Sequence, residues 1–496
     1  MQVPMIQVRL QCGAQAPLSL AAALASLAET CLSMQGLTQI HARALRSHLQ
    51  DHPMVLAKIF RFAAVTPSGD LRYAHRLFDQ IPRPNGFFHN LLIRGYSSSS
   101  QPCVSVDLFN QMRRNGVDPD GHSFTFLLKA RSRMEGRSDD VHGLVVRLGF
   151  SGYLFVKNAL IHMYAMGGMP AGARRVFDET RAADVVSWSG LVTAHVRAGE
   201  LELAREVFDA MPERDVVSWT ALISGYTQAS RSREALELFW DMGEAGVWPD
   251  EVTMVSVISA CSNLKDGETG LKIHRYIEEN GFGWMVSLGN ALIHMHAQCG
   301  CMEQAWQVFN GMGRRSSITW NCMILACANH GDAEDAIDLF QRMVQSNMRP
   351  DKATFLALLV AYAHKGLVDE GYRLFRCMRR EFSIEAGIEH YGCMVDTLGR
   401  AGRLEEAYNL IIRMPMPSND VIWGSLLAAC RIYHDVEMGE RVVRKLFELN
   451  PRKGGYYVLL RDIYIAAGRT DEANEMEQTM AADGALKTPG YSWLGG

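Results

Sequence analysis

The stretch VVSWTALISGYTQASRSREALELFWDMGEAGVWPD, residues 216–250, shows how this chain is built. Its first half carries an apolar stripe with the helical spacing i, i+3, i+4, i+7, made of Trp219, Leu222, Ile223 and Tyr226. After a polar break, a second stripe with the same spacing comprises Ala235, Leu238, Phe239 and Met242. Gly246 and the segment 248–250 (WPD) stop the second helix. The stretch therefore predicts two short helices joined by a turn.

The second helix of this stretch recurs along the chain. Its phenylalanine has counterparts, and the series is Phe78, Phe109, Phe177, Phe208, Phe239, Phe309, Phe340 and Phe375. The intervals are 31, 68, 31, 31, 70, 31 and 35 residues, which correspond to units of 31 and about 35 residues. Such periods are typical of solenoids, in which each unit covers the apolar face of the next. We therefore predict an all-α fold, a right-handed α-solenoid of stacked helix-turn-helix repeats.

Composition sets limits on function. The chain has 496 residues, more than one domain usually holds, and a repeat array escapes that limit because it grows in one dimension. The net charge of −4 argues against a protein that simply coats phosphate groups. The eleven scattered cysteines fit a reducing compartment, and no apolar run long enough for a membrane span is present.

The N-terminal segment is poor in acidic residues. Residues 1–28 contain no Asp or Glu, which is the style of an organellar transit peptide, although Arg9 is their only basic residue. We predict a transit peptide over residues 1–30, with a plain unstructured start as the alternative.

Polar residues recur at two places in each unit. We divide the array into units 86–120, 121–153, 154–184, 185–215, 216–250, 251–285, 286–316, 317–351, 352–387 and 388–419. In six of them a polar fifth residue is combined with a polar last residue, and these fifth residues are Asn90, Asn158, Ser189, Thr220, Asn290 and Asn321. The last residue of the same units is Asp120, Asp184, Asp215, Asp250, Ser316 or Asp351. Helix N-capping and a polar preference in the first turn explain these residues without a ligand. A ligand-reading role explains them equally well.

Several phrases resemble the plant pentatricopeptide repeat family, in its PLS subclass of alternating repeat lengths. They are MPERDVVSWTALISGYTQ (211–228), REALELFWDMGEAGVWPD (233–250), VSLGNALIHMHAQCG (286–300) and HYGCMVDTLGRAGRLEEAYNLIIRMP (390–415). The resemblance covers roughly residues 35–493. It implies divergent N-terminal repeats at 31–85, ten repeats at 86–419, and two C-terminal extension motifs, E1 and E2, at 420–496.

The resemblance implies sequence-specific binding of single-stranded organellar RNA, with the fifth and last residues of a unit choosing one base. The pairs expected to select U are Asn90 with Asp120, Asn158 with Asp184, and Asn321 with Asp351. The pairs expected to select G are Ser189 with Asp215, and Thr220 with Asp250. Asn290 with Ser316 is expected to select a pyrimidine. Four pairs depart from the code, namely Thr125/Tyr153, Val255/Met285, Leu356/Gly387 and Gly392/Asn419. The expected site, from 5′ to 3′, is U-n-U-G-G-n-Y-U-n-n.

The extension motifs resemble those of factors for cytidine-to-uridine RNA editing. Some such proteins carry a further deaminase domain of the DYW type, whose zinc site needs H-x-E and C-x-x-C. None of the 16 histidines is followed two residues later by Glu, and no two cysteines are three apart. We therefore expect no catalytic residues and no cofactor, and a deaminase and multiple organellar RNA editing factors acting in trans through residues 420–496. The protein is expected as a monomer on RNA, away from membranes, in the mitochondrion or, as second choice, the chloroplast.

Three other interpretations fit parts of the sequence. The cluster His294, His296, Cys299 and Cys301 suggests a metal site, but His294 and His296 lie about 200° apart on a helix, so no metal is expected. A splicing, stability or processing factor would read RNA by the same chemistry. A protein-binding scaffold of the tetratricopeptide type would use 34-residue units instead.

Overall fold

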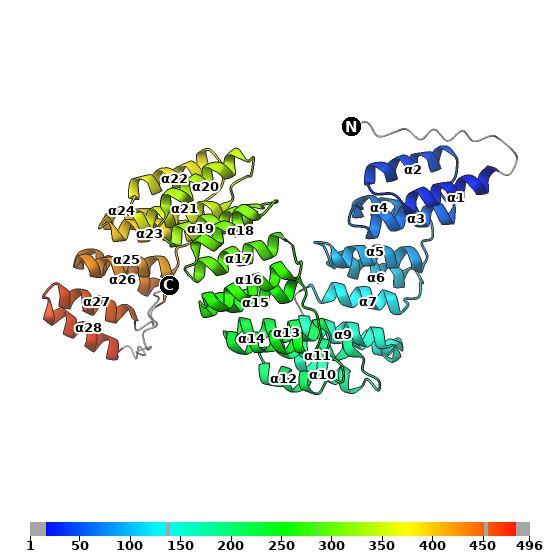
Figure 1. The fold of residues 1–496 in the computed structure, drawn as a ribbon, viewed down its shortest axis with the longest axis horizontal. Helices are drawn as coiled ribbons and strands as arrows, with labels where there is room; N and C mark the ends of the chain where they lie inside the picture. Colours follow the sequence, from blue (N-terminus) through cyan, green and yellow to red (C-terminus); the bar gives the residue numbers. More distant parts are fainter. Residues whose placement is uncertain (1–15, 135–138, 284, 451–454, 483–496) are drawn as a thin grey trace. The chain divides into compact units, whose positions relative to one another are not determined.

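The computed structural model describes residues 16–134, 139–283, 285–450 and 455–482 (Figure 1). Within them the secondary structure consists of helices α1–α28 and one 3-10 helix, η1, with no strand. The predicted all-α fold is confirmed for these residues. The predicted transit peptide lies outside the described residues up to residue 15, and the end of the second extension motif, from residue 483, also lies outside them.

The chain divides into two compact parts, Met1–Asp250 and Glu251–Gly496. The helices of the first part are α1 (Ala16–Glu29), α2 (Met34–Arg46), α3 (Pro53–Val65), α4 (Leu71–Asp79), α5 (Gly86–Ser98), α6 (Cys103–Arg114), α7 (Gly121–Arg131), α8 (Asp139–Arg147), η1 (Phe150–Gly152), α9 (Leu154–Met166), α10 (Pro170–Asp178), α11 (Val185–Arg197), α12 (Leu201–Asp209), α13 (Val216–Gln228) and α14 (Ser232–Glu244). Residues 16–29, within the predicted transit peptide, thus form a helix, and it packs against α3.

The helices of the second part are α15 (Glu251–Leu264), α16 (Gly267–Glu279), α17 (Val286–Gln298), α18 (Met302–Gly311), α19 (Ser317–Asn329), α20 (Ala333–Gln345), α21 (Lys352–Lys365), α22 (Val368–Arg380), α23 (Ile388–Arg400), α24 (Leu404–Ile412), α25 (Asp420–Tyr433), α26 (Val436–Leu449), α27 (Gly455–Ala466) and α28 (Thr470–Ala482). From α5 onward, every odd-numbered helix up to α23 begins at the first residue of one of the units laid out above.

Within each part the helices form a solenoid of pairs. The first helix of a pair stacks on the first helix of the next pair, as α9 does on α11 and α19 on α21. The second helix packs against its own partner and against the first helix of the following pair, as α10 does against α9 and α11. The first helices therefore form one continuous layer in each part, and a residue that recurs at one position of these helices forms a row.

The recurring aromatic residues join neighbouring pairs. The rings of Phe208 and Trp219 meet edge to face with centroids 4.7 Å apart, and those of Phe309 and Trp320 do so at 5.1 Å. Each pair links the second helix of one unit to the first helix of the next, and Phe208, Trp219, Phe309 and Trp320 are all buried. The prediction that the phenylalanines fill the space between repeats is confirmed.

Glycine makes the turn between the two helices of a unit. Gly199 and Gly300 each follow a first helix with φ of 77°, in the left-handed region that is costly for residues with a Cβ. This turn fixes where the second helix begins, and so it holds the register of the stripes that pack between units.

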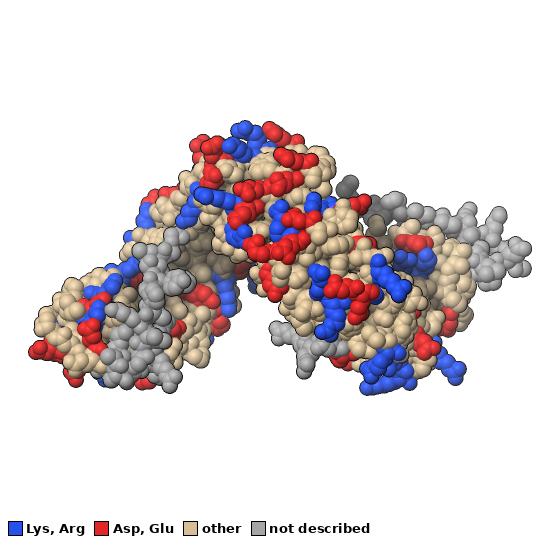
Figure 2. All heavy atoms as spheres, turned by 90° about the horizontal axis from the view of Figure 1, so that it is seen from below, with Lys and Arg blue, Asp and Glu red and all other residues tan. Residues whose placement is uncertain are grey.

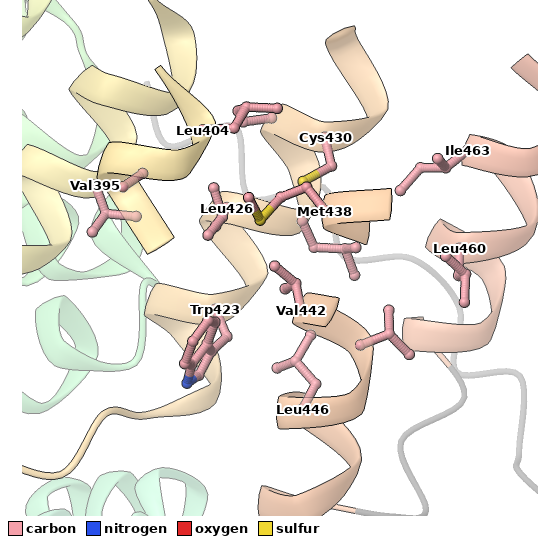
Figure 3. Packing of buried hydrophobic residues seen from close by; sticks show 14 of the residues in the cluster. Val395, Leu404, Trp423, Leu426, Cys430, Met438, Val442, Leu446, Leu460 and Ile463 are labelled. Atoms are coloured by element: carbon pink, nitrogen blue, oxygen red, sulfur yellow. The ribbon is translucent and has the colours of Figure 1, made fainter. Parts of the chain in front are cut away.

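The extension region shares its core with the last repeat (Figure 3). One cluster of buried side chains runs without a break from Val395 and Leu404 through Trp423 and Leu426 to Leu446 and Ile463. The helices α25–α28 are therefore a continuation of the stack. No helix in the described ranges combines the length and apolar character needed to cross a bilayer.

Candidate nucleic-acid interface

The last residue of most units caps the first helix of the next unit. The carboxylate Oδ1 atoms of Asp120, Asp184 and Asp351 accept hydrogen bonds from the backbone N–H groups of Ser123 (2.8 Å), Ser187 (2.9 Å) and Thr354 (3.0 Å). Asp215 caps α13 through Ser218 in the same way, at 2.9 Å. The N-capping explanation of these aspartates is thus confirmed. Their carboxylates also accept other hydrogen bonds besides those of the cap.

The same aspartates contact the fifth residue of their own unit. The side-chain Nδ2 of Asn90 donates to both carboxylate oxygens of Asp120, at 3.1 and 3.0 Å. Asn158 donates in the same way to Asp184, at 3.0 and 3.1 Å. Asn321 donates to Asp351 at 2.9 Å. Residues 26 to 30 positions apart are therefore joined at the edge of the first-helix layer, and the same contact is found in three of the ten units.

A third residue completes each contact. The hydroxyl groups of Ser123, Ser187 and Thr354, three residues after the cap, donate to the Oδ1 atoms of Asn90 (2.6 Å), Asn158 (2.5 Å) and Asn321 (2.6 Å). We refer to these sets as the Asn–Asp–hydroxyl triads: Asn90–Asp120–Ser123, Asn158–Asp184–Ser187 and Asn321–Asp351–Thr354. The sequence analysis missed the hydroxyl members. Their signal was a buried Ser or Thr at the third position of consecutive units, as also found at Ser218, Thr253 and Thr319.

Each triad fixes the orientation of its amide. An ionised carboxylate can only accept hydrogen bonds, so the asparagine must turn its NH₂ toward Asp and its carbonyl toward the hydroxyl. Burial raises the pKa of Asp120, but the hydrogen bonds from Ser123 and Asn90 lower it by more, so this pKa lies below its usual range. The same holds for Asp184, whose pKa is lowered by the hydrogen bonds from Ser187 and Asn158. Both carboxylates are therefore ionised at neutral pH. Each amide keeps one N–H and one lone pair for a ligand.

The Ser and Thr units present a different set of atoms. The hydroxyl of Ser189 lies 2.7 Å from Asp215 Oδ1, and Ser189 is buried, with 3% of its surface exposed. The same hydroxyl also lies 2.7 Å from the carbonyl oxygen of Val185, so its one proton points to one of these two acceptors. In either case Ser189 keeps acceptor lone pairs beside the second carboxylate oxygen of Asp215. Thr220 occupies the same position in α13 and is also buried, with 8% exposed.

Asn290 stands apart from the other asparagines. Its Oδ1 is buried without a hydrogen-bond partner. The hydroxyl of Thr319, which sits where a triad would use it, pairs instead with Ser316, at 3.1 Å. Since a serine hydroxyl can both donate and accept, Ser316 does not fix the amide orientation as an aspartate does. This unit therefore holds a buried acceptor without a partner at its fifth position.

The units that depart from the family code lack the contact between the fifth and the last residue. Thr125 donates to the backbone carbonyl of Gly121 at 2.9 Å, and Tyr153 at the end of that unit is exposed. Asn419 caps α25 through Ile422, at 3.0 Å, with no side chain at Gly392 to meet it. In neither of these two units do the fifth and last residues form a hydrogen-bonded pair of polar side chains.

The first helices carry a second row of recurring residues, which was not predicted from the sequence. The second residue of many units is a large apolar side chain that is exposed: Phe87, Phe155, Val186, Val217, Val252, Ile318 and Val421. The second and fifth residues of a helix lie on one face, so five of these apolar side chains lie one turn before a polar fifth residue, whereas Val252 and Val421 precede Val255 and Gly424. Val186 thus precedes Ser189, and Ile318 precedes Asn321. The signal in the sequence was an apolar residue, repeated once per unit, that belongs to neither core stripe.

The surface charge is mixed. On the face shown in Figure 2, acidic and basic side chains alternate without a continuous basic strip. The coloured part of this face therefore has no general positive field of the kind that holds a polyanion by charge alone.

The histidines of the suspected metal cluster point to different helices. His294 Nδ1 lies 3.4 Å from Ser262 Oγ on α15, and His296 Nε2 lies 3.0 Å from His274 Nδ1 on α16. In the part of the chain that the structure describes, no three His, Cys, Asp or Glu side chains gather as a metal would require.

The His274–His296 pair makes stability depend on pH. Burial, with repulsion from His274, lowers the pKa of His296 to about 4, and burial lowers the pKa of His274 against the opposing effect of Glu278. A lowered histidine pKa stabilises the fold above about pH 6.5, the unfolded value. As the pH falls from about 6.5 toward the folded pKa, we expect the free energy of unfolding to drop by about 1.4 kcal/mol per pH unit for His296.

Denaturant unfolding between neutral and mildly acidic pH checks this expectation. His296→Gln should flatten the pH dependence, whereas His434→Gln, on an exposed residue, should leave the wild-type slope. An unchanged slope in His296→Gln would show that other groups set it.

A triad hydroxyl can be removed without changing shape. Thr354→Val takes the donor from Asn321 Oδ1 and leaves it unsatisfied, so we expect a loss of about 0.5–1.5 kcal/mol in base discrimination at that unit, with U and C becoming more nearly equal. Titration of RNAs that differ only at that base measures the loss. Thr397→Val is the control, since the Thr397 hydroxyl is also buried but bonds the Cys393 carbonyl at 2.7 Å. Equal discrimination in both variants would contradict the orienting role of Thr354.

Comparison with known families gives matches over most of the chain. The family model described as PPR repeat matches residues 87–117, 155–185, 186–216, 290–317, 353–381 and 389–416, and the one described as PPR repeat family matches 214–263 and 315–364. The model described as E motif matches residues 433–495.

Individual pentatricopeptide repeat proteins also match this chain over most of its length. The pentatricopeptide repeat-containing protein At5g15300 of Arabidopsis thaliana is 41% identical, with 93% of this chain and 91% of the relative covered. At5g56310 of the same plant is 39% identical, covering 93% and 88%. At1g59720, whose name adds "chloroplastic/mitochondrial", is 36% identical, covering 94% and 71%. The crystal structure of the pentatricopeptide repeat protein PPR10 from maize shares the fold, with a TM-score of 0.53 at 18% identity, covering 94% of this chain and 84% of that one.

Proposed function

This chain is a pentatricopeptide repeat protein of the PLS subclass with a C-terminal E motif, and from that membership we propose that it binds single-stranded organellar RNA in a sequence-specific way and directs cytidine-to-uridine editing. The observation that carries the proposal is the set of Asn–Asp–hydroxyl triads. They occur in three of the ten units, and each holds an amide in a single orientation at the edge of the first-helix layer. Such repetition suits a polymeric ligand that offers one group per unit.

The triads suit a pyrimidine. Each oriented asparagine offers one N–H and one lone pair, and a pyrimidine Watson–Crick edge offers a neighbouring acceptor and donor. Fixing the amide fixes which of the two pyrimidines matches it, and the family code assigns this orientation to U. At Asn290 the aspartate is replaced by Ser316, so both orientations are open and either pyrimidine is accepted.

The serine and threonine units suit guanine. Ser189 directs its proton to Asp215 or to the Val185 carbonyl, and its lone pairs, together with the second carboxylate oxygen, are acceptors. The Watson–Crick edge of guanine carries two adjacent donors, N1–H and the N2 amino group, which match two acceptors. A wrong base would leave these buried polar atoms unpaired, which costs about 1–3 kcal/mol. Thr220 with Asp250 is assigned the same preference.

The exposed apolar row supplies a surface for the base faces. Side chains such as Val186, Val217 and Ile318 lie one turn from the polar positions and are open to solvent. Apolar walls on either side of a base remove its faces from water and are tolerant of sequence. Because polar side chains contact the base edges and apolar side chains cover the base faces, a chain of net charge −4 can bind RNA.

The extension region is the proposed docking surface for a deaminase of the DYW type supplied in trans. It continues the repeat stack through one core, so a partner bound there keeps a fixed position relative to the array. Its helices expose large apolar side chains, including Ile432, Tyr433, Leu449 and Ile465, as protein interaction surfaces do. The name of one relative supports an organellar location.

Sequencing organellar transcripts from plants that lack the protein tests the proposal. We expect loss of editing at one or a few cytidines that follow a match to U-n-U-G-G-n-Y-U. Intact editing with altered transcript ends or retained introns would contradict the editing role. It would instead assign the protein to RNA processing or splicing, with the same base-reading array.

A further inference from the structure

A cavity of about 330 Å³ opens between the last two repeats of the array. Its walls come from the end of α22, from the segment 384–386, from the first turn of α23 and from the end of α24. Four arginines line it, and they are Arg376, Arg379, Arg380 and Arg413. We call this cavity the arginine pocket.

The arginine pocket carries a local positive charge in an overall acidic chain. Glu385 is the one acidic residue among its lining residues, and it pairs with Arg379 at 3.2 Å. Within the described residues, no ion pair engages Arg376, Arg380 or Arg413. The negative end of the α22 dipole accounts for basic residues at 379 and 380. Arg413 reaches the same cavity from the C-cap of α24, so the ends of two helices bring arginines to one place.

Aromatic rings form another wall of the pocket. Phe375 and Tyr391 both line it, and their rings meet edge to face with centroids 5.0 Å apart. Guanidinium groups bind phosphate oxygens through paired N–H donors, and aromatic rings offer a flat face for a base. Unpaired arginines beside exposed ring surface are therefore the chemistry that suits a nucleotide strand.

The position of the pocket relates it to the row of base-reading residues. Ala386 lines the pocket and precedes Gly387, the last residue of its unit. The two units that flank the pocket have no reading pair, because Leu356 is apolar and Gly392 has no side chain. An RNA strand passing these units cannot be held through its base edges.

We propose that the arginine pocket binds phosphodiester groups of the RNA strand on the 3′ side of the U selected by Asn321 and Asp351. The pocket thus replaces base contacts with backbone contacts where the array stops reading. This inference rests on the proposed RNA-binding function, and it adds a sequence-independent anchor at the end of the array nearest the extension region.

The test compares two triple variants of the full chain. The pocket variant carries Arg376→Gln, Arg380→Gln and Arg413→Gln, which removes the three unpaired positive charges of the pocket. The control variant carries Arg43→Gln, Arg113→Gln and Arg114→Gln, which removes the same number of charges from exposed arginines elsewhere. Two of these arginines lie at the end of α6, as Arg379 and Arg380 lie at the end of α22. The probes are a labelled RNA of sequence UAUGGACU followed by an oligo-adenosine tail, and a shorter RNA that ends at the final U of that sequence.

We expect the pocket variant to bind the tailed RNA about tenfold more weakly at about 0.15 M salt, with the salt dependence of log Kd reduced by about 0.7 for each phosphate that the pocket no longer neutralises. On the short RNA, the pocket variant should match the wild type. The control variant should lose little on either RNA. Thermal unfolding should be the same for all three proteins, because the substituted side chains are exposed.

The outcomes separate the two proposals. A wild-type protein that binds neither RNA would overturn the proposed function, and this inference with it. A wild-type protein that binds both RNAs, with a pocket variant no weaker than the control on the tailed RNA, would overturn the inference alone. An equal loss on tailed and short RNA would also overturn it, since the pocket would then not contact the 3′ segment.

Discussion

A protein carrying both Ser189→Asn and Thr220→Asn is expected to prefer U-n-U-U-U over U-n-U-G-G, reversing the preference of the wild type at two adjacent positions. Each asparagine would donate its Nδ2 to the aspartate that already ends the unit, Asp215 or Asp250. Guanine would then lose its two acceptors and meet an amide oriented for uracil. Good base contacts are worth about 1–3 kcal/mol each, and about 1.4 kcal/mol is tenfold in Kd. This is the largest specificity change that the array predicts.

The structure already holds the group that the new asparagine at position 189 needs. Ser218 is buried at the third position of the following unit, where Ser187 and Thr354 orient the native asparagines. The hydroxyl of Ser218 now donates to the backbone carbonyl of Asp215 at 2.9 Å, and rotation about χ1 could direct it to a new amide. The asparagine at position 189 is therefore expected to complete a triad with Asp215 and Ser218, and the variant to fold as the wild type does.

Equilibrium titration of the four RNAs that combine G or U at the two positions measures the change. Thr193→Asn with Ser224→Asn is the matched control, because it places the same residue one turn further along the same helices, α11 and α13. The control should keep the wild-type preference for G. If the reader variant keeps that preference as well, Ser189 and Thr220 do not select the base.

The second large effect concerns the joint between the array and its extension. Trp423→Ala is expected to lower the free energy of unfolding of the C-terminal helices by about 3–5 kcal/mol. Trp423 is 2% exposed, its indole N–H donates to Ser418 Oγ at 2.9 Å, and its ring meets that of Tyr408 at 5.4 Å. It stands in the middle of the cluster that runs from the last repeat into the extension (Figure 3).

Because each unit of a solenoid is stabilised mainly by its neighbours, the loss should be local. We expect limited proteolysis of the Trp423→Ala variant to cut near residues 413–420, while the helices before α23 remain resistant. Val421→Ala is the control, since Val421 lies two residues away in the same helix and is 68% exposed. Identical digestion of the two variants would show that the extension does not depend on this joint.

The Trp423→Ala variant also separates the two roles proposed for the chain. The residues proposed to read U-n-U-G-G-n-Y-U extend no further than Thr354, well before Trp423, so binding of this RNA should survive. Editing in plants should fail, because a loosened extension no longer places a partner at a fixed distance from the bound strand.

The helix pairs, their stripes and the rows of polar residues could all be predicted from the amino-acid sequence. They follow from periodicities, 3.6 residues within a helix and 31 or about 35 residues between units, which can be counted without coordinates. The positions of Asn158 and Asp184, or of Phe208 and Trp219, follow from that counting. The family code followed from resemblance, and the pairing of bases with units stays a prediction.

How these residues meet could not be predicted in this way, because it depends on the stacking of the units. Capping and base reading looked like competing explanations of Asp184, yet its carboxylate both caps α11 and holds Asn158. The hydroxyl of Ser187 completes the contact from the following unit, and Arg413 reaches the arginine pocket from a different helix than Arg376. Periodicity places a residue on a face of its own helix. The stacking of one pair on the next sets which atoms of two units lie within hydrogen-bond distance, and so the contacts that choose a ligand exist only in the folded array.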